Sequence, residues 1–296
     1  MMDHASKPKK ATFKPKKPHS KKAHSIREKV IAYIFLVLCS IFFVVPLLWM
    51  LLTALKSTED LQTGVFFPTK LYWDNFKTAV KSVPFGQYTF NSLYYALFAT
   101  IGTVFSCTIT SYAFAKLNWP GRDKLFMVLI ATMVIPSQII QIPLYIIYFK
   151  LGWIDTYNPL IIPLWFGVGQ AANIFLLRQF FMGIPNSLKE SARLDGANEF
   201  QIFWTIMLPL VRQMLVVVAI MTFLNCWNDF YNPLLYINDS NLFPLAYAIR
   251  TFATQYSNQN NLIMAASLIM TIPSLILFFL AQKQIVGSVA HTGTKG

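Results

Sequence analysis

The sequence predicts an all-α integral membrane protein with six transmembrane helices. Of the 296 residues, 55% are hydrophobic and only 12% are charged, whereas soluble domains carry about 25% charged residues. A helix that crosses the lipid needs about 20 apolar residues. Six stretches meet that length, and none has the two-residue alternation of a strand. They are residues 30–52, 89–115, 125–149, 158–182, 210–236 and 260–284.

Residues 1–29, before the first apolar stretch, are predicted to form a disordered basic tail. They contain ten Lys and Arg residues against Asp3 and Glu28, interleaved with prolines, and this composition cannot build a core. Such a tail holds the N-terminus in the cytoplasm and is attracted to anionic lipid. No aromatic stacking surface accompanies it, so nucleic-acid binding is not expected. The apolar stretch that follows is too long for a cleaved signal peptide.

The distribution of basic residues predicts the orientation. With the N-terminus inside, the cytoplasmic segments hold 19 of the 25 Lys and Arg residues, and the outer segments hold six. An excess of Lys and Arg in cytoplasmic loops sets the orientation of helical membrane proteins. We therefore expect a transmembrane domain over residues 30–286, a cytoplasmic loop over 184–209 and a cytoplasmic C-terminal tail over 287–296.

Residues 184–209 form the longest polar interval between the apolar stretches, and their chemistry predicts two short helices. Ser187 and Glu190 have the spacing of a capping box, in which each side chain accepts from the other residue's backbone N–H. Gly196 can end this helix in a left-handed conformation, and Asn198 can cap a second helix. Capping alone favours a simple, well-ordered connection between membrane helices over a binding surface.

Polar side chains inside two apolar stretches are candidates for a solute pathway. Asp229 is the only acidic residue within the six stretches, and an ionisable group inside a membrane is a functional candidate. Hydrogen bonding between helices, or a position near the outer interface, explains it as well. The candidates are Gln138 and Gln141, which share a helical face, and Asn225, Asn228, Asp229 and Asn232, which form one continuous helical stripe.

No catalytic or cofactor-binding pattern accompanies these residues in the sequence. The phosphate-binding pattern G-x-x-x-x-G-K-[ST] is absent, and the four histidines lie near the two ends of the chain. Cys39, Cys107 and Cys226 lie in three different apolar stretches and are typical of small buried hydrophobic residues. We therefore expect no catalytic site, no metal and no cofactor in this chain.

The loop carries a longer motif. The residues E-S-A begin at Glu190, Gly196 follows after three residues, and I-x-L-P ends at Pro209. This order resembles the EAA loop of inner-membrane permease subunits in binding-protein-dependent ABC importers. Ser191 stands where that family usually has alanine, and it is still small. F-L-L-R-Q-F-F from Phe175 and F-x-x-x-W-N-D-F from Phe223 are similar to motifs of the carbohydrate branch, in particular of the second permease in maltose-type transporters.

The resemblance implies an ATP-driven importer of a sugar, expected to be an oligosaccharide, in a bacterial inner (plasma) membrane. This chain would form half of the pathway beside a second permease subunit, and an extracytoplasmic solute-binding protein would deliver the solute. Two separate ATP-binding subunits, holding ATP and Mg²⁺, would dock on the loop 184–209, where small residues admit a close approach and Lys189 is expected on the surface. The implied coupling residues are Ser187, Glu190, Ser191, Ala192, Asp195, Gly196 and Ala197.

Two other functions remain open from the sequence. An ion-coupled secondary transporter would need ion-binding groups near the middle of the membrane, and Asp229 is a thin basis for one. An integral membrane enzyme would need a catalytic set, which the sequence lacks. Only an importer requires a separate ATPase held through the loop, so copurification of an ATPase distinguishes the three.

The predicted orientation can be tested with reporter fusions. Because the basic residues gather on one side, reporters fused after Lys124, Arg193 and Lys295 should be cytoplasmic, and those after Lys70 and Ser240 should be external. Paired phosphatase and fluorescent-protein reporters measure this directly. An external reporter after Arg193 would contradict the prediction, since the loop would then face away from ATP.

Overall fold

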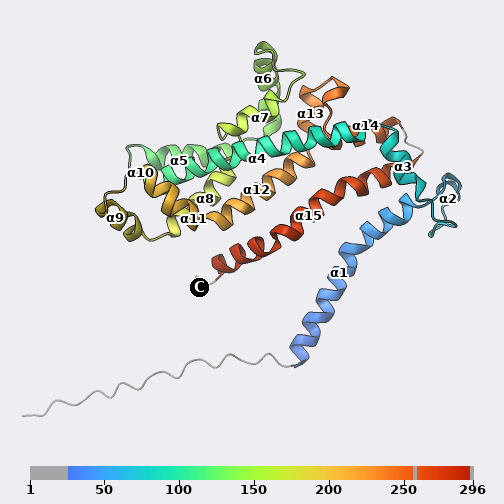
Figure 1. Ribbon diagram of the computed structural model, residues 1–296, viewed down its shortest axis with the longest axis horizontal. Helices are drawn as coiled ribbons and strands as arrows, with labels where there is room; N and C mark the ends of the chain where they lie inside the picture. Colours follow the sequence, from blue (N-terminus) through green and yellow to red (C-terminus); the bar gives the residue numbers. More distant parts are fainter. Residues whose placement is uncertain (1–25, 256–258, 294–296) are drawn as a thin grey trace, which may run out of the picture. The chain divides into compact units, whose positions relative to one another are not determined.

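The computed structural model describes residues 26–255 and 259–293, and all regular elements in these ranges are helical (Figure 1). This confirms the all-α prediction for the described residues. The chain separates into two compact units, residues 1–48 and 49–296, which are described in turn. Residues 1–25, most of the predicted basic tail, lie outside the described residues.

Unit 1 contains most of helix α1 (Ile26–Ala54), which matches the first predicted span. Its side chains from Glu28 to Leu48 are exposed, apart from half-buried Cys39. A helix that is apolar on all sides cannot stay exposed to water, so α1 is suited to lipid or to a partner helix.

Unit 2 contains the remaining helices, many of them short. In chain order they are α2 (Thr58–Thr63), α3 (Asp74–Lys81), α4 (Phe85–Lys116), α5 (Arg122–Ala131), η1 (Thr132–Val134), α6 (Ser137–Lys150), α7 (Asn158–Trp165), α8 (Ala171–Gly183), α9 (Asn186–Leu194), α10 (Glu199–Gln201), the π-helix η2 (Ile202–Met207), α11 (Leu208–Leu210), α12 (Arg212–Trp227), α13 (Tyr231–Tyr236), η3 (Ser240–Leu242), α14 (Leu245–Gln255) and α15 (Asn260–Gly293).

Helix α4 is the long unbroken helix along which α7, α8, α12 and α14 pack (Figure 1). Its polar side chains bond to backbone groups near the ends of these neighbours. Ser106 Oγ donates to Leu164 O in α7 at 2.9 Å, and Ser92 Oγ accepts from the Leu245 N–H at the start of α14 at 2.7 Å. Within a membrane such backbone groups need protein partners, and α4 supplies them.

The predicted span 125–149 is bent, 158–182 is divided, and 210–236 is bent at its start and broken after Trp227. The axis turns by 100° between Val134 and Ser137 and by 76° between α11 and α12. The first bend contains Pro136, which disfavours helical backbone at the residue before it. The stretch 158–182 forms two helices, α7 and α8, because Gly167 and Gly169 have φ of +71° and +73°, outside the right-handed helical region.

By length and composition, three helices among the described residues can cross a membrane, and as many as five if each bent pair is one span. The C-terminal helix α15 continues to Gly293 and so includes most of the predicted tail 287–296. The three cysteines are free, and Cys107 and Cys226 are buried, in agreement with their prediction as small core residues.

The close packing of α4 against α7 can be tested at Gly102. A Cβ atom at this position would meet the Trp165 indole directly, and the same indole donates from Nε1 to Phe98 O at 3.1 Å. We expect Gly102→Ala to destabilise the protein by about 1–3 kcal/mol, the usual cost of overpacking. Thermal unfolding in detergent measures this.

Gly86→Ala is the matched control on the same helix, because a Cβ atom there meets nothing within 4 Å. Removing a helical glycine at an open position should leave stability unchanged or raise it by up to about 1 kcal/mol. Equal melting temperatures for the two variants would contradict the assigned contact between α4 and α7.

Candidate functional site

The loop 184–209 begins with α9, whose start differs from the prediction. α9 begins at Asn186 after Pro185, and no side chain caps its first turn. Ser187 lies within the helix, where its own backbone is already helical, so it is not the N-cap. The predicted capping box of Ser187 and Glu190 is therefore wrong, because the extended backbone at Pro185, with φ −58° and ψ 135°, starts the helix two residues earlier.

The end of α9 agrees with the prediction. Gly196 has φ +87°, and its N–H donates to Arg193 O at 3.0 Å, while the Ala197 N–H donates to Ala192 O at 2.9 Å. This pair of bonds is a Schellman motif, which satisfies the last carbonyl groups of a helix and requires a left-handed residue. Gly196 therefore ends α9 sharply and directs the chain away.

Asn198 caps the second helix of the loop, as predicted. The Gln201 N–H donates to Asn198 Oδ1, and the Asn198 N–H donates to Gln201 Oε1, both at 2.9 Å. The helix then continues as α10, η2 and α11 instead of as one uniform α-helix. Single π-turns of this kind occur frequently at functional sites.

The predicted coupling residues do not all face outward. Ala192 is 7% exposed and belongs to a buried cluster with Tyr112 and Phe203, so a partner cannot reach its side chain. Lys189 is 6% exposed, and its prediction as a surface residue is wrong because its ammonium is bound within the chain. Ala197 is half-buried. The exposed members are Ser187, Glu190, Ser191, Asp195 and Gly196.

Two exposed leucines accompany the small residues on α9, and the sequence prediction missed them. Leu188 is 44% exposed and Leu194 is 88% exposed, and Ser191 lies three residues from each. Residues three apart share a helix face, so this face presents apolar, small and apolar side chains in turn. Leucine within an otherwise polar helix is the signal that could have identified it.

A charged cluster lies behind this face. The Glu199 carboxylate accepts from the Tyr112 hydroxyl at 3.0 Å and lies 3.1 Å from Lys189 Nζ. Its other oxygen, Oε1, accepts from Arg193 Nε at 2.9 Å. Glu199 thus contacts α4 through Tyr112 and α9 through the two basic residues, so one carboxylate joins three elements.

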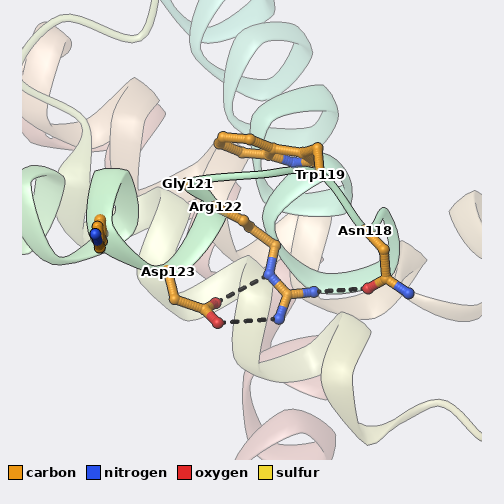
Figure 2. A pocket seen from close by; sticks show the side chains of 6 residues that line it. Asn118, Trp119, Gly121, Arg122 and Asp123 are labelled. Atoms are coloured by element: carbon orange, nitrogen blue, oxygen red, sulfur yellow. Dashed lines mark hydrogen bonds and ion pairs between the residues drawn. The ribbon is translucent and has the colours of Figure 1, made fainter.

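A polar groove runs beside α9 along the connection from α4 to α5. One cavity of about 310 Å³ is lined by residues 118–119 and 121–124. Figure 2 shows the Arg122 guanidinium between the Asp123 carboxylate and the Asn118 side chain, with distances of 2.9 Å and 3.2 Å. A neighbouring cavity of about 540 Å³ shares Arg122 and also contacts Glu190 of α9. The larger cavity is also lined by Lys189, Arg193 and Glu199, so the groove borders the charged cluster and not the face formed by Leu188, Ser191 and Leu194.

A second polar site lies between α4, α7, α8 and α12, and it contains part of the predicted solute pathway. Its cavity has a volume of about 300 Å³. Asp229 Oδ2 accepts there from the Tyr95 hydroxyl at 2.9 Å, and Asn173 Nδ2 donates to Gln170 Oε1 at 2.7 Å. The lining residues are Tyr95, Leu164, Gln170, Asn173, Thr222, Asn225, Cys226, Asp229 and Asn232.

The predicted stripe over residues 225–232 is not one continuous helical face. α12 ends at Trp227, and Asp229 Oδ1 accepts from the N–H groups of Tyr231 and Asn232 at 3.0 and 3.1 Å. Asp229 therefore caps α13, which is why a new helix begins there. Asn228 lies outside the cavity lining, and its side chain donates to its own helix.

The two predicted glutamines also lie apart from this cavity lining. Gln141 Oε1 accepts from the Tyr231 hydroxyl at 2.9 Å, which connects α6 to α13. Gln138 is exposed, and its side chain accepts a hydrogen bond from the hydroxyl of its neighbour Ser137. The cavity instead uses Gln170 and Asn173, whose spacing of three residues inside an apolar stretch was a readable signal.

One lining residue has an unused polar group. Thr222 is 6% exposed, and within the described residues its Oγ1 has no hydrogen-bond partner. A buried hydroxyl without a partner costs free energy, so a polar ligand in the cavity would be stabilised by it. In the part of the chain that the structure describes, no group of three His, Cys, Asp or Glu residues could hold a metal ion.

The loops predicted to be external are joined by Asp155. Its Oδ1 accepts from the Asn238 N–H at 2.5 Å and from the Asp239 N–H at 3.1 Å. These backbone hydrogen bonds, first that of Asn238, hold the pKa of the Asp155 carboxyl below its usual value. The carboxylate thereby fixes the loop after α6 to the loop after α13.

Comparison with known proteins identifies the family. The family model described as "Binding-protein-dependent transport system inner membrane component" matches residues 102–291. The arabinooligosaccharides transport system permease protein AraQ of Bacillus subtilis (strain 168) is 31% identical over 269 residues, covering 89% of this chain and 94% of that protein. The sn-glycerol-3-phosphate transport system permease protein UgpE of Yersinia enterocolitica is 32% identical over 207 residues, covering 69% of this chain and 73% of that protein.

A solved structure has the same fold. It is the structure of a bacterial ABC transporter involved in the import of the acidic polysaccharide alginate, and it matches with a TM-score of 0.75 at 22% sequence identity. The match covers 88% of this chain and 98% of that one. The family model spans well over half of the sequence, and the two relatives agree with it. The chain therefore belongs to the family of binding-protein-dependent transport system inner membrane components.

Proposed function

We propose that this chain forms half of the translocation pathway of an importer for neutral oligosaccharides and is moved by a separate ATPase that docks on residues 184–209. As a member of its family, the chain is a non-catalytic permease subunit of the inner membrane. The proposal adds the class of solute, the docking site and the arrangement in the membrane. ATP and Mg²⁺ would be bound by the partner ATPase alone.

The proposed arrangement has six crossings in a domain spanning residues 30–286, with both chain ends in the cytoplasm. The crossings are α1, α4, the bent pair of α5 and α6, the divided pair of α7 and α8, the segment from α11 to α13, and α15. The 19-to-6 distribution of basic residues supports this orientation. The assembly would comprise a second permease subunit, two ATP-binding subunits and an external solute-binding protein.

The observation that carries the docking site is the outward face of α9. Leu194 is 88% exposed, and it lies beside the small residues Ser191 and Gly196. An exposed leucine flanked by small residues fits a pocket on a partner, since it provides an apolar anchor and the neighbours allow the backbone to come close. Glu190 and Asp195 provide polar contacts at the margin.

The chemistry of the polar cavity favours a neutral sugar. Carboxamides, two hydroxyls and one carboxylate line it, and its lining contains no Lys or Arg. These groups exchange hydrogen bonds with sugar hydroxyls, whereas a phosphate or a uronic acid calls for a cation. The cavity is thus more consistent with the neutral solute in the name of AraQ than with the glycerol phosphate in the name of UgpE.

An ion-coupled mechanism fits the same residues poorly. A proton or sodium carrier needs a carboxylate that is available to the ion at the middle of the membrane. Asp229 is already engaged by Tyr95 and by the side chain of Asn232, at 2.9 and 2.8 Å, and it caps α13. These bonds give Asp229 a structural role that does not require a coupling ion.

The docking face can be tested by removing its apolar anchor. Leu194→Ala should reduce copurification of the ATPase about tenfold or more, because a central anchor of an interface contributes about 1–3 kcal/mol. Ser191→Trp should have a similar effect by steric obstruction. Expression and thermal stability should remain normal, since both side chains are exposed. Copurified ATPase and ATP-driven uptake in proteoliposomes are the measurements.

Leu151→Ala provides the matched control, because Leu151 is also exposed, at 55%, but lies in the loop after α6. It should leave ATPase association unchanged. Ala192→Trp is unsuitable for this test, since the buried Ala192 side chain would disrupt the chain's own core. Normal association in both Leu194→Ala and Ser191→Trp would rule out this face as the docking site.

The solute site can be tested with two asparagines of the predicted stripe. Asn225 lines the cavity and Asn228 does not. Asn225→Ala should lower oligosaccharide uptake by up to about tenfold, the equivalent of one net hydrogen bond, while Asn228→Ala should change it little. Uptake of labelled neutral oligosaccharides, acidic oligosaccharides and glycerol 3-phosphate would be compared. Preferred uptake of either anion would contradict the proposed solute class.

A further inference from the structure

Two lysines join the C-terminal end of α4 to α9 in opposite directions. Lys116, the last residue of α4, donates from Nζ to Ile184 O at 2.6 Å and to Asn186 Oδ1 at 2.8 Å, where α9 begins. Lys189 of α9 donates from Nζ back to Lys116 O at 2.7 Å. The two side chains are 8% and 6% exposed. Each helix therefore holds the other by a buried ammonium group.

Glu199 supplies the negative charge that allows Lys116 and Lys189 to be buried close together. Two buried ammonium groups close together repel each other, and Glu199, 3.1 Å from Lys189, supplies the compensating charge. The same carboxylate binds the Tyr112 hydroxyl, which comes from α4 four residues before Lys116. Without this charge, the Lys189 ammonium would be left buried beside Lys116 with the Lys116 carbonyl group as its hydrogen-bond partner.

Helix α4 also reaches the polar cavity. Tyr95, which bonds to Asp229, lies on the same helix as Tyr112, and the separation of 17 positions corresponds to about 25 Å of helix. α4 is unbroken from Phe85 to Lys116 and contains no proline. A displacement at its C-terminal end is thus carried to the cavity by one stiff element.

Burial of the two lysine side chains is not explained by stability alone. Apolar side chains of similar volume usually stabilise a fold as well as a buried ion pair does. A charged cluster differs from them in its directional bonds, which fix the orientation of α9 relative to α4. Apolar contacts would let the two helices slide or rotate.

We propose that Glu199 is a positioning residue that locks α9 to α4, so that movement of α9 is transmitted along α4 to the Tyr95–Asp229 contact in the polar cavity. The proposal rests on the proposed function, because it takes the ATPase as the source of that movement. Glu199 does not line the solute cavity, and it contacts α9 through Lys189 and Arg193 and not through Leu188, Ser191 or Leu194. Its role is to make α4 and α9 move as one body.

Glu199→Gln tests the proposal, because it keeps the shape of the side chain and removes its charge. The reconstituted complex with its ATPase should retain ATPase association and basal ATP hydrolysis. The number of solute molecules transported per ATP should fall at least about fivefold, the lower end of the usual coupling between two sites. An unchanged ratio in Glu199→Gln would overturn the proposal.

Glu59→Gln is the matched control, since Glu59 is exposed in α2, distant from the loop in the sequence. The same chemical change there should leave the transport ratio, ATP hydrolysis and stability at their original values. A reduced ratio in Glu59→Gln equal to that in Glu199→Gln would also overturn the proposal, because the effect would then not depend on the α4–α9 contact.

A double variant separates positioning from folding. Glu199→Gln leaves the Lys189 ammonium without its counter-charge and should lower the melting temperature. Adding Lys189→Met removes the buried charge and should restore the melting temperature. If Glu199 has a positioning role, the double variant remains uncoupled even though it is stable. Recovery of the wild-type transport ratio together with stability would show that Glu199 serves folding alone.

The wild-type complex distinguishes failure of this inference from failure of the proposed function. If wild-type protein transports solute with ATP and Glu199→Gln does so with the same ratio, the positioning role is wrong and the importer function stands. If wild-type protein neither binds an ATPase nor transports with ATP, the proposed function fails first, and with it the source of movement that Glu199 would transmit.

Discussion

The need to satisfy backbone polar groups at breaks in the helices shapes most of unit 2. A membrane offers no water to an exposed N–H or C=O group, yet several apolar stretches are bent or divided here. α4 carries polar side chains on otherwise apolar turns, and these form hydrogen bonds with the backbone groups that the breaks leave unpaired. Ser92 accepts a hydrogen bond from the backbone at the start of α14, and Ser106 donates one to the backbone of α7. Lys116 donates one to the backbone in the connection between α8 and α9. The unbroken helix thus allows its neighbours to be broken.

Several of the polar side chains that line the cavity lie at or next to these breaks in the helices. The end of α12 places Asp229 at the polar cavity, where it caps α13 and accepts from Tyr95. The interval between α7 and α8 brings Gln170 to the same cavity. Continuous helices would have separated these groups along their axes. The divided helices bring short polar segments together around the polar cavity.

The two sides of α9 have different surroundings. The outward side, with Leu194 and Ser191, is free to contact a partner, whereas the inward side is committed to the chain itself. Ala192 lies in the core, and Lys189 is held by Glu199 and by the end of α4. A force applied to the outward side would therefore reach α4 through directional bonds, and α4 leads to the cavity.

Local patterns were sufficient for the features that depend on near neighbours in the chain. Hydrophobicity and charge predicted a helical membrane protein, because an apolar stretch of about 20 residues has few alternatives. The left-handed Gly196 and the cap at Asn198 were predicted correctly, since each depends on residues within one helical turn. The motif from Glu190 to Pro209 predicted the family for the same reason, because it is a continuous segment of sequence.

Tertiary structure decided the features that depend on residues far apart in the sequence. Ser187 has the spacing of a cap, yet the backbone at Pro185 starts α9 two residues earlier, and Lys116 of α4 binds there. The sequence predicts Lys189 at the surface, but in the structure it is buried against Glu199 and α4. Gln138 and Gln141 share a helical face and Asn228 belongs to the predicted stripe, but none of the three lines the cavity. The sequence by itself determined which segments are helical and apolar, because those properties are local. Only the packing of α4 against segments up to about 150 positions away decided which polar groups meet, because burial and long-range hydrogen bonds exist only once the helices are assembled.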